Sequence, residues 1–232
     1  MKLKWLGHSA FRLEAGNSVI LIDPFLKGNP TFTGDFDETI KGTTHILVTH
    51  GHDDHVGDAA EIARATGAQV VSNFEICMFL NAQGAQNVNP GNTGGTFSCG
   101  EFKVSFTPAL HSSCTIVDGK PIYLGNPNGL VIDHPNAPNI FHFGDTDLFS
   151  DMALIEELYK PRIGLVPVGD RFTMSGDTAA LAVQRFFRFD HIVPMHYGTF
   201  PIIDQTPDRF IEAMGEQRTK IVAPKPGQAV GV

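Results

Sequence analysis

Three histidines and two aspartates stand in one short segment directly after an apolar run. The run is Ile46–Val48, and the segment that follows reads Thr49-His50-Gly51-His52-Asp53-Asp54-His55. Imidazole and carboxylate groups are the ligands that hold Zn²⁺, Mn²⁺ or iron in proteins. His50 and His52 can share one ion, whereas the adjacent Asp54 and His55 must point elsewhere and suit a second. The spacing therefore predicts a two-metal site rather than an ordinary polar turn.

Further ligands for two ions must come from distant parts of the chain. Three other apolar runs end in a residue that can bind a metal: residues 104–110 precede His111, residues 139–144 precede Asp145, and residues 192–195 precede His196. Short apolar runs bounded by turn residues are typical of buried strands. Functional residues of layered α/β folds gather at strand ends, so we expect these side chains to meet at one edge of a sheet.

The order of these residues resembles the signature of the metallo-β-lactamase superfamily. Within it, the chain is similar to small single-domain metal-dependent hydrolases near the ascorbate-phosphate lactonase branch. The supporting segments are residues 5–11, 21–25, 55–58 and 172–174. The resemblance implies an α/β fold, an αββα four-layer sandwich of two mixed β-sheets flanked by helices, with the metals at the edge between the sheets.

The resemblance also assigns the ligands, with Zn²⁺ preferred and Mn²⁺ or iron as alternatives. It implies His50, His52 and His111 for one ion, Asp54, His55 and His196 for the other, and Asp145 as a bridge. Asp23 would stand behind them and accept the remaining ring N–H of a ligand histidine, which fixes the tautomer. The alternative role for Asp23 is that of a turn residue before Pro24.

Three more residues are candidates for contact with the substrate. His8 lies in the family-like opening segment and Tyr197 directly follows a ligand, so either could polarise the substrate. Arg171 stands where members of the family tend to carry His. A guanidinium there could recognise an anion or form an ordinary surface salt bridge. The four other histidines outside the ligand set are expected to be structural: His45, His134, His142 and His191.

The composition predicts one large domain over residues 1–232. The chain is 42% hydrophobic, which is enough for a substantial core. No linker, repeat, signal segment or membrane-length apolar run interrupts it. Cys77, Cys99 and Cys114 form neither a disulfide framework nor a CxxC pair, which is typical of a reducing compartment. We expect a cytoplasmic protein that needs no membrane.

The net charge of −8 opposes a role with nucleic acid. Binding to phosphate backbones depends on clustered Lys and Arg that release counterions, and the chain has no basic stripe. We therefore expect a small-molecule substrate as the partner. A homo-oligomer is compatible with the sequence.

Hydrophobic periodicity and turn residues predict alternating strands and helices. Strands are expected at residues 2–6, 10–14, 18–22, 69–72, 163–168 and 191–195, and helices at residues 56–65, 74–80, 147–159, 175–187 and 208–214. Residues 91–133 are rich in Gly, Asn and Pro and should form antiparallel strands without a helix. Ala179, Ala180, Val183, Phe186 and Phe187 should face the core.

The expected chemistry is hydrolysis by water that two ions activate, since metals lower the pKa of bound water from ~15.7 toward ~7. Asp54 and Asp145 would serve catalysis as ligands. The substrate would be a small ester, lactone, thioester or phosphoester, and the branch resemblance favours a lactone or phosphorylated sugar. No G-x-S-x-G elbow or P-loop offers another mechanism. The alternatives are a diiron redox protein and a non-catalytic metal-binding or sensor domain.

Overall fold

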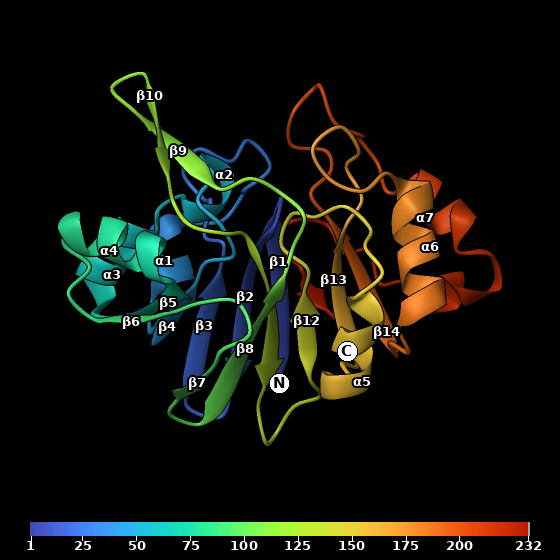
Figure 1. The fold of residues 1–232 in the computed structure, drawn as a ribbon, viewed down its shortest axis with the longest axis horizontal. Coiled ribbons are helices and arrows are strands. Elements are labelled where there is room, and N and C mark those ends of the chain that lie inside the picture. Colours follow the sequence, from blue (N-terminus) through green and yellow to red (C-terminus); the bar gives the residue numbers. More distant parts are fainter. Residues whose placement is uncertain (232) are drawn as a thin grey trace.

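A computed structural model describes residues 1–231 and contains two large β-sheets (Figure 1). The first sheet is antiparallel from β15 to β3 and parallel from β3 to β6. Its strands, in spatial order, are β15 (Ala229–Val230), β1 (Lys2–Gly7), β2 (Ala10–Ala15), β3 (Ser18–Ile22), β4 (His45–Leu47), β5 (Gln69–Asn73) and β6 (Val88–Gly91).

The second sheet is also mixed, with a parallel half made by β12, β13 and β14. Its strands, in spatial order, are β14 (His191–Met195), β13 (Ile163–Pro167), β12 (Ile140–His142), β11 (Asn128–Asp133), β8 (Phe102–Pro108) and β7 (Thr96–Cys99). A separate hairpin of β9 (Cys114–Val117) and β10 (Lys120–Tyr123) projects from the body of the molecule in Figure 1.

Four layers result because each sheet buries both faces. One core cluster lies between the sheets and joins residues such as Phe11 and Leu13 with Phe106 and Leu130. A second cluster packs the first sheet against α3 (Ala59–Thr66) and α4 (Phe74–Ala82), and a third packs the second sheet against α5 (Met152–Tyr159), α6 (Gly176–Phe186) and α7 (Asp208–Ala213). The two sets of helices flank the sheets on opposite sides in Figure 1. The expected αββα sandwich is confirmed.

Capping residues fix the start of two helices that were predicted from the pattern. The Asn73 side chain accepts a hydrogen bond from the Ile76 amide at 2.8 Å, and the Ser175 hydroxyl accepts one from Thr178 at 3.2 Å. Such caps satisfy amides that have no partner inside the helix. The apolar face predicted for α6 is buried in the third cluster, although Phe186 is only partly buried.

Several predicted boundaries were wrong. The helix expected from residue 147 begins only at Met152, because residues 147–151 form a turn and irregular structure. Four short elements outside the metal-ligand segment were missed, namely α1 (Phe36–Ile40), β6, β15 and a 3₁₀ helix over Gly215–Lys220. They are too short to show a periodicity. Within residues 1–231, no helix has the length and apolar character needed to cross a membrane.

The helix expected over residues 56–65 is in fact two helices. The first, α2 (Asp53–Val56), lies inside the metal-ligand segment and ends at Gly57, which has φ +45°. A Cβ at this position would lie 2.6 Å from the Pro24 carbonyl oxygen. Asp58 then accepts hydrogen bonds from the amides of Leu26 and Lys27 before α3 begins. The break therefore seats α2 against the loop that follows β3.

Replacing Gly57 with Ala should destabilise the protein by roughly 3 kcal/mol, because it combines a positive φ with a backbone clash. Gly67→Ala is the matched control. Gly67 also has a positive φ, at the C-cap of α3, but its Cβ would meet nothing within 4 Å. This variant should lose only about 1 kcal/mol. Urea unfolding measures both, and equal losses would contradict the packing role of Gly57.

Candidate metal centre

All seven predicted ligands follow strand ends of the two sheets. His50, His52, Asp54 and His55 belong to the segment that leaves β4 and forms α2. The second sheet supplies the others, because His111 follows β8, Asp145 follows β12 and His196 follows β14. The structure brings these seven side chains together in two adjoining groups, and a third set of His50, His55 and Asp145 overlaps both.

The first group, called the histidine group here, consists of His50, His52 and His111. The His52 Nδ1 atom lies 3.0 Å from His50 Nε2 and 3.2 Å from His111 Nε2. Three ring nitrogens thus point at one place, although His111 comes from the other sheet. The ring of His52 must turn its Nδ1 inward, and its Nε2 remains outside.

The second group, called the mixed group here, consists of Asp54, His55 and His196, and His8 lies close enough to be counted with it. Asp145 joins the two groups. Its Oδ2 atom lies 3.0 Å from His196 Nε2 and 3.5 Å from His111 Nε2, and its Oδ1 lies 3.3 Å from His55 Nε2. One carboxylate therefore faces a ligand set on each side.

The side chains present fit divalent ions. Within residues 1–231, the buried atoms His55 Nε2 and Asp145 Oδ1 face each other across 3.3 Å inside the cluster, and neither forms a hydrogen bond. Unpartnered buried polar atoms are costly unless something else satisfies them. Imidazole nitrogens with two carboxylates suit Zn²⁺, Mn²⁺ or iron. The histidine group and the mixed group would each hold an ion, with Asp145 shared.

Burial and neighbouring charges shift the pKa values of the cluster. Burial lowers the pKa of His50 and His52 and brings the pKa of His111 to about 4, so these rings are neutral, as ligands must be. Burial would raise the pKa of Asp145, but His196 and His55 lower it well below its ordinary value. Burial opposes protonation of His55, yet Asp145 and Asp23 raise its pKa well above the usual range.

Asp23 is placed behind the ligands as its family position implied. Its Oδ2 atom lies 2.7 Å from His55 Nδ1, and it accepts the Thr49 amide and hydroxyl at 2.8 and 2.7 Å. The Thr49 hydroxyl in turn lies 2.9 Å from His50 Nδ1. One buried carboxylate thus orients a histidine of each group, one directly and one through Thr49.

Ser112 supports His52, and this serine was not identified from the sequence as part of the site. Its hydroxyl lies 3.2 Å from His52 Nε2, the ring nitrogen that faces away from the histidine group. Ser113, next to it, accepts the Gly51 amide at 3.0 Å. The segment before β9 is therefore tied to the ligand loop. The position of Ser112 directly after the candidate ligand His111 could have identified it from the sequence.

His8 does not have the exposure that contact with a substrate requires. The side chain is 0% exposed, and its Nε2 atom lies 2.9 Å from Asp54 Oδ2. Burial and the nearby His196 lower its pKa to about 4. The ring is covered by protein, and it is Asp54 rather than His8 that lines the central cavity, which opens onto the cluster.

Tyr197 is not among the residues that line the central cavity. Its ring lies 5.2 Å from that of Trp5, centroid to centroid, and packs against the core. Burial and the charge of Asp208 raise its pKa to about 12. Adjacent residues at the end of a strand point in different directions, which separates Tyr197 from the ligand His196.

Arg171 is exposed beside the site rather than in it. It lines an outer cavity of about 500 Å³ together with Asp147, Phe172 and Arg209. Among residues 1–231 the ion pairs do not include Arg171, so the surface salt bridge considered for it does not form here. Its guanidinium carbon lies 5.7 Å from the Phe172 ring centroid.

The four remaining histidines lie outside both groups. His142 is buried and bonded to the backbone, with Nε2 3.0 Å from the Ser9 carbonyl oxygen and Nδ1 3.0 Å from the Gly144 amide. His45 bonds Thr44, and His134 is near Glu101. His191 is partly exposed at the start of β14.

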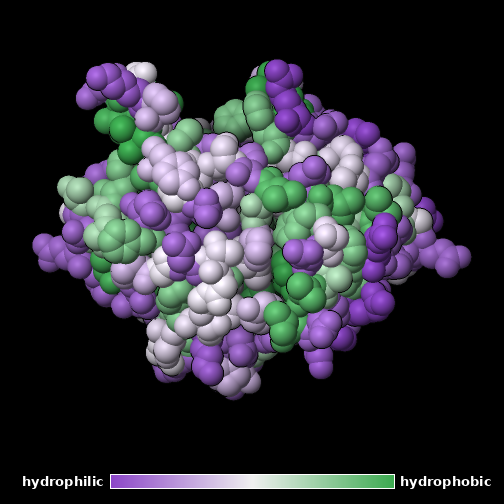
Figure 2. Space-filling view, viewed as in Figure 1, coloured by the Kyte–Doolittle hydropathy of each residue, from purple (hydrophilic) through white to green (hydrophobic). Residues whose placement is uncertain are grey.

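A central cavity of about 350 Å³ opens onto the cluster. Its wall combines ligand atoms with two aromatic rings: His52, Asp54, His111, Ser112, Asp145, Phe172, His196 and Phe200. Phe172 is 48% exposed. In the space-filling view the molecule is hollowed between the β9–β10 hairpin and the loops on the other side (Figure 2). The central cavity is small, and Phe172 and Phe200 supply its apolar surface.

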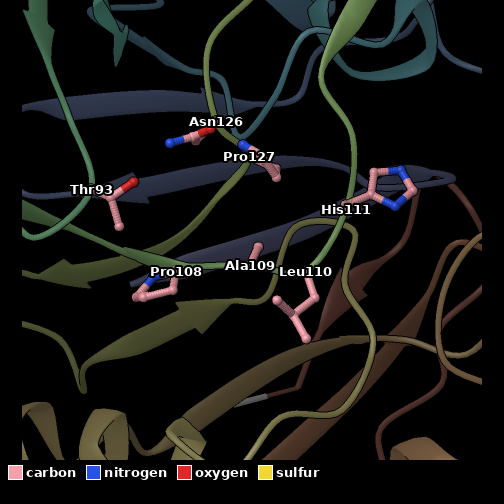
Figure 3. A pocket seen from close by; sticks show the side chains of 7 residues that line it. All are labelled: Thr93, Pro108, Ala109, Leu110, His111, Asn126 and Pro127. Carbon is pink, nitrogen blue, oxygen red and sulfur yellow. The ribbon is translucent and has the colours of Figure 1, made fainter.

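A side cavity of about 490 Å³ begins at His111. It is lined by Thr93, Pro108, Ala109, Leu110, His111, Asn126 and Pro127 (Figure 3). No Lys, Arg, Asp or Glu belongs to this lining. In Figure 3 the His111 ring stands at one end and Thr93 at the other. Leu110, 54% exposed, separates the side cavity from the outer cavity.

A four-layer sandwich with a His/Asp cluster at the sheet edge defines a metallo-hydrolase of the β-lactamase fold. Residues 2–196 match the family model described as a β-lactamase superfamily domain. A UPF0173 metal-dependent hydrolase of Methylocella silvestris is 63% identical over 227 residues, 98% of each chain. Another, of a Chelativorans species, is 57% identical over 232 residues, 99% of each chain.

A solved structure agrees with these relatives. Igni18, a metallo hydrolase from the archaeon Ignicoccus hospitalis, is 36% identical with a TM-score of 0.87, over 99% of this chain and 97% of that one. The chain belongs to the UPF0173 metal-dependent hydrolases of the β-lactamase superfamily.

Metal binding near neutral pH should release about one proton from His55, because Asp145 and Asp23 raise its pKa and a ligand nitrogen must be free of its proton. Affinity should therefore fall as the pH is lowered. Isothermal titration of Zn²⁺ in buffers of different ionisation enthalpy counts the protons. Binding heats that do not depend on the buffer would contradict a protonated His55.

Proposed function

We propose that this protein is a binuclear metal-dependent hydrolase of a small ester, lactone, thioester or phosphoester. The observation that carries the proposal is the position of Asp145. Its two oxygens face ligand sets from both sheets within 3.0–3.5 Å. Such a carboxylate can hold two ions near each other, as two-metal hydrolases require.

Divalent ions bound at such a site supply Lewis acidity and water of lowered pKa. The residues of this chain do the remaining work. Burial keeps His50 and His111 neutral, Asp23 fixes the ring orientation of His55, and the two sheets hold the groups at a fixed separation. Ser112 is the one serine that lines the central cavity, and its hydroxyl lies 3.2 Å from His52 Nε2, where it can hold the ring of that histidine in place.

The cavity walls support a small substrate with an uncharged body. The central cavity offers Phe172 and Phe200 for apolar contact, and the side cavity presents no charged side chain. A further anionic group on the substrate could pair with Arg171 in the outer cavity, where Arg209 is already paired with Asp170 and Asp177. Within the proposed range, these walls favour an ester, lactone or thioester.

We propose Zn²⁺ or Mn²⁺ as the ions and the cytoplasm as the location. The ligand set contains only nitrogen and oxygen donors, which both metals accept. Cys77, Cys99 and Cys114 are free, as expected in a reducing compartment. Burial raises the pKa of Cys77 to about 12 and that of Cys99 to about 11, so these thiols are unreactive.

Chelated protein and a His52→Ala variant should lose hydrolysis by at least about 100-fold, and added Zn²⁺ or Mn²⁺ should restore the chelated protein alone. A panel of lactones, thioesters and phosphodiesters, with metal analysis, measures this. His191→Ala is the control, since that histidine lies at the far end of β14. Full turnover without metal would overturn the proposal. A visible iron spectrum would favour the diiron alternative, and an inactive two-metal protein would favour the sensor.

Phe172→Ala should raise KM roughly tenfold and change kcat little, because the ring offers apolar surface to the bound substrate without touching the reacting atoms. Leu158→Ala, an exposed residue of α5 outside the cavity, is the control. Steady-state kinetics on a hydrolysed substrate separates the two parameters. An unchanged KM would exclude the Phe172 wall from the substrate site.

A further inference from the structure

We infer that His8 is a positioning residue that aims Asp54 at the mixed group and so sets how tightly the ion there is held. This inference rests on the proposed two-metal site. His8 lies in the turn between β1 and β2, far from the ligands in sequence. Its role would differ from that of Asp23, which orients histidines, because His8 acts on a carboxylate.

Both ring nitrogens of His8 are engaged. Nε2 lies 2.9 Å from Asp54 Oδ2, and Nδ1 lies 2.9 Å from the Thr199 hydroxyl. Burial keeps the His8 ring neutral, and for a neutral ring one arrangement of hydrogens satisfies both contacts: the Thr199 hydroxyl donates to Nδ1, and Nε2–H donates to the carboxylate. A ring that donates from Nε2 has no free electron pair there, which makes His8 a support for the ligand Asp54.

Asp54 depends on this contact. Its side chain is 27% exposed, and in the hydrogen bonds of residues 1–231 His8 is the one side chain that bonds its carboxylate. Without it, the carboxylate could turn toward solvent. The bond itself is shielded, because His8 is fully buried and packs against the rings of His196 and Phe200 at 4.1 and 5.4 Å between centroids. A hydrogen bond in such a dry setting is stronger than at the surface.

The backbone of His8 adopts an unfavourable conformation that places this ring. His8 has φ +51°, a region that residues other than Gly rarely adopt, and the strand register shifts between Trp5 and Gly7. The carbonyl of His8 accepts the Trp5 indole N–H at 2.9 Å and the His196 amide at 3.1 Å. Strained residues held by several bonds are typical of functional sites.

These contacts connect the two sheets through one residue. The side chain of His8 holds Asp54, a ligand of the first sheet, while its carbonyl holds the backbone of His196, a ligand of the second. The spacing between two ligands of the same ion is therefore fixed by a residue that does not bind it. This is the second observation, beside the hydrogen bond, that favours a positioning role.

Two variants with similar bulk test the inference. His8→Leu removes the donor, whereas His8→Gln keeps an N–H group at a similar distance from the backbone. Stepwise Zn²⁺ titration against a competing chelator, with melting curves of the metal-free proteins, gives the affinity for each ion. His8→Leu should weaken one of the two ions 10- to 100-fold and leave the other within about twofold, and His8→Gln should recover most of the loss.

Thr199→Val is the second test and does not alter His8 itself. It removes the hydroxyl that fixes the His8 ring and should weaken the same ion several-fold. Wild-type affinities in His8→Leu or in Thr199→Val would overturn the inference, as would equal losses in His8→Leu and His8→Gln, which indicate packing or direct ligation. A wild-type protein that binds a single ion would instead overturn the two-metal proposal.

Discussion

The burial of one carboxylate among imidazoles from two sheets is the constraint on which the rest of the structure depends. Asp145 is 2% exposed and lies 3.0–3.5 Å from ring nitrogens of His55, His111 and His196. A buried anion needs positive charge or several donors beside it. Burial lowers the pKa of His111, whereas Asp145 and Asp23 raise the pKa of His55, so a bound cation can replace the proton of His55 as the positive charge beside Asp145. The sandwich keeps both sheet edges within reach of this single group.

Backbone strain is concentrated around the same centre. Seven non-glycine residues in the described range 1–231 have a positive φ, and five of them are His8, Asp23, Asp170, Arg171 and His196. Three of these belong to the proposed metal site or its support: His8, Asp23 and the candidate ligand His196. Each such conformation costs about 1 kcal/mol or more. The surrounding hydrogen bonds offset this cost, for example the three donors that Asp23 accepts.

The meeting of the seven candidate ligands could be predicted from sequence because they combine rare residue types with strand ends, as in His50-Gly51-His52 after an apolar run. The sandwich itself came from the family resemblance. The burial and packing of individual side chains could not be predicted. His8 and Tyr197 were candidates for contact with the substrate, but His8 is fully buried and the Tyr197 ring packs near Trp5. The hydroxyl of Ser112 and the short strand β15 carry no pattern of their own, since both are defined by contacts distant in sequence.

Ligands and cavity walls come from different kinds of structure in this protein. Strand ends locked by two sheets hold the metal site, whereas Leu110, Phe172 and Phe200 come from loops between elements. Loops tolerate substitution better than the core does. A change in these walls would therefore alter substrate choice without moving Asp145 or its neighbours. The same centre can serve different substrates on this fold, which is why the walls, more than the ligands, decide what this hydrolase cleaves.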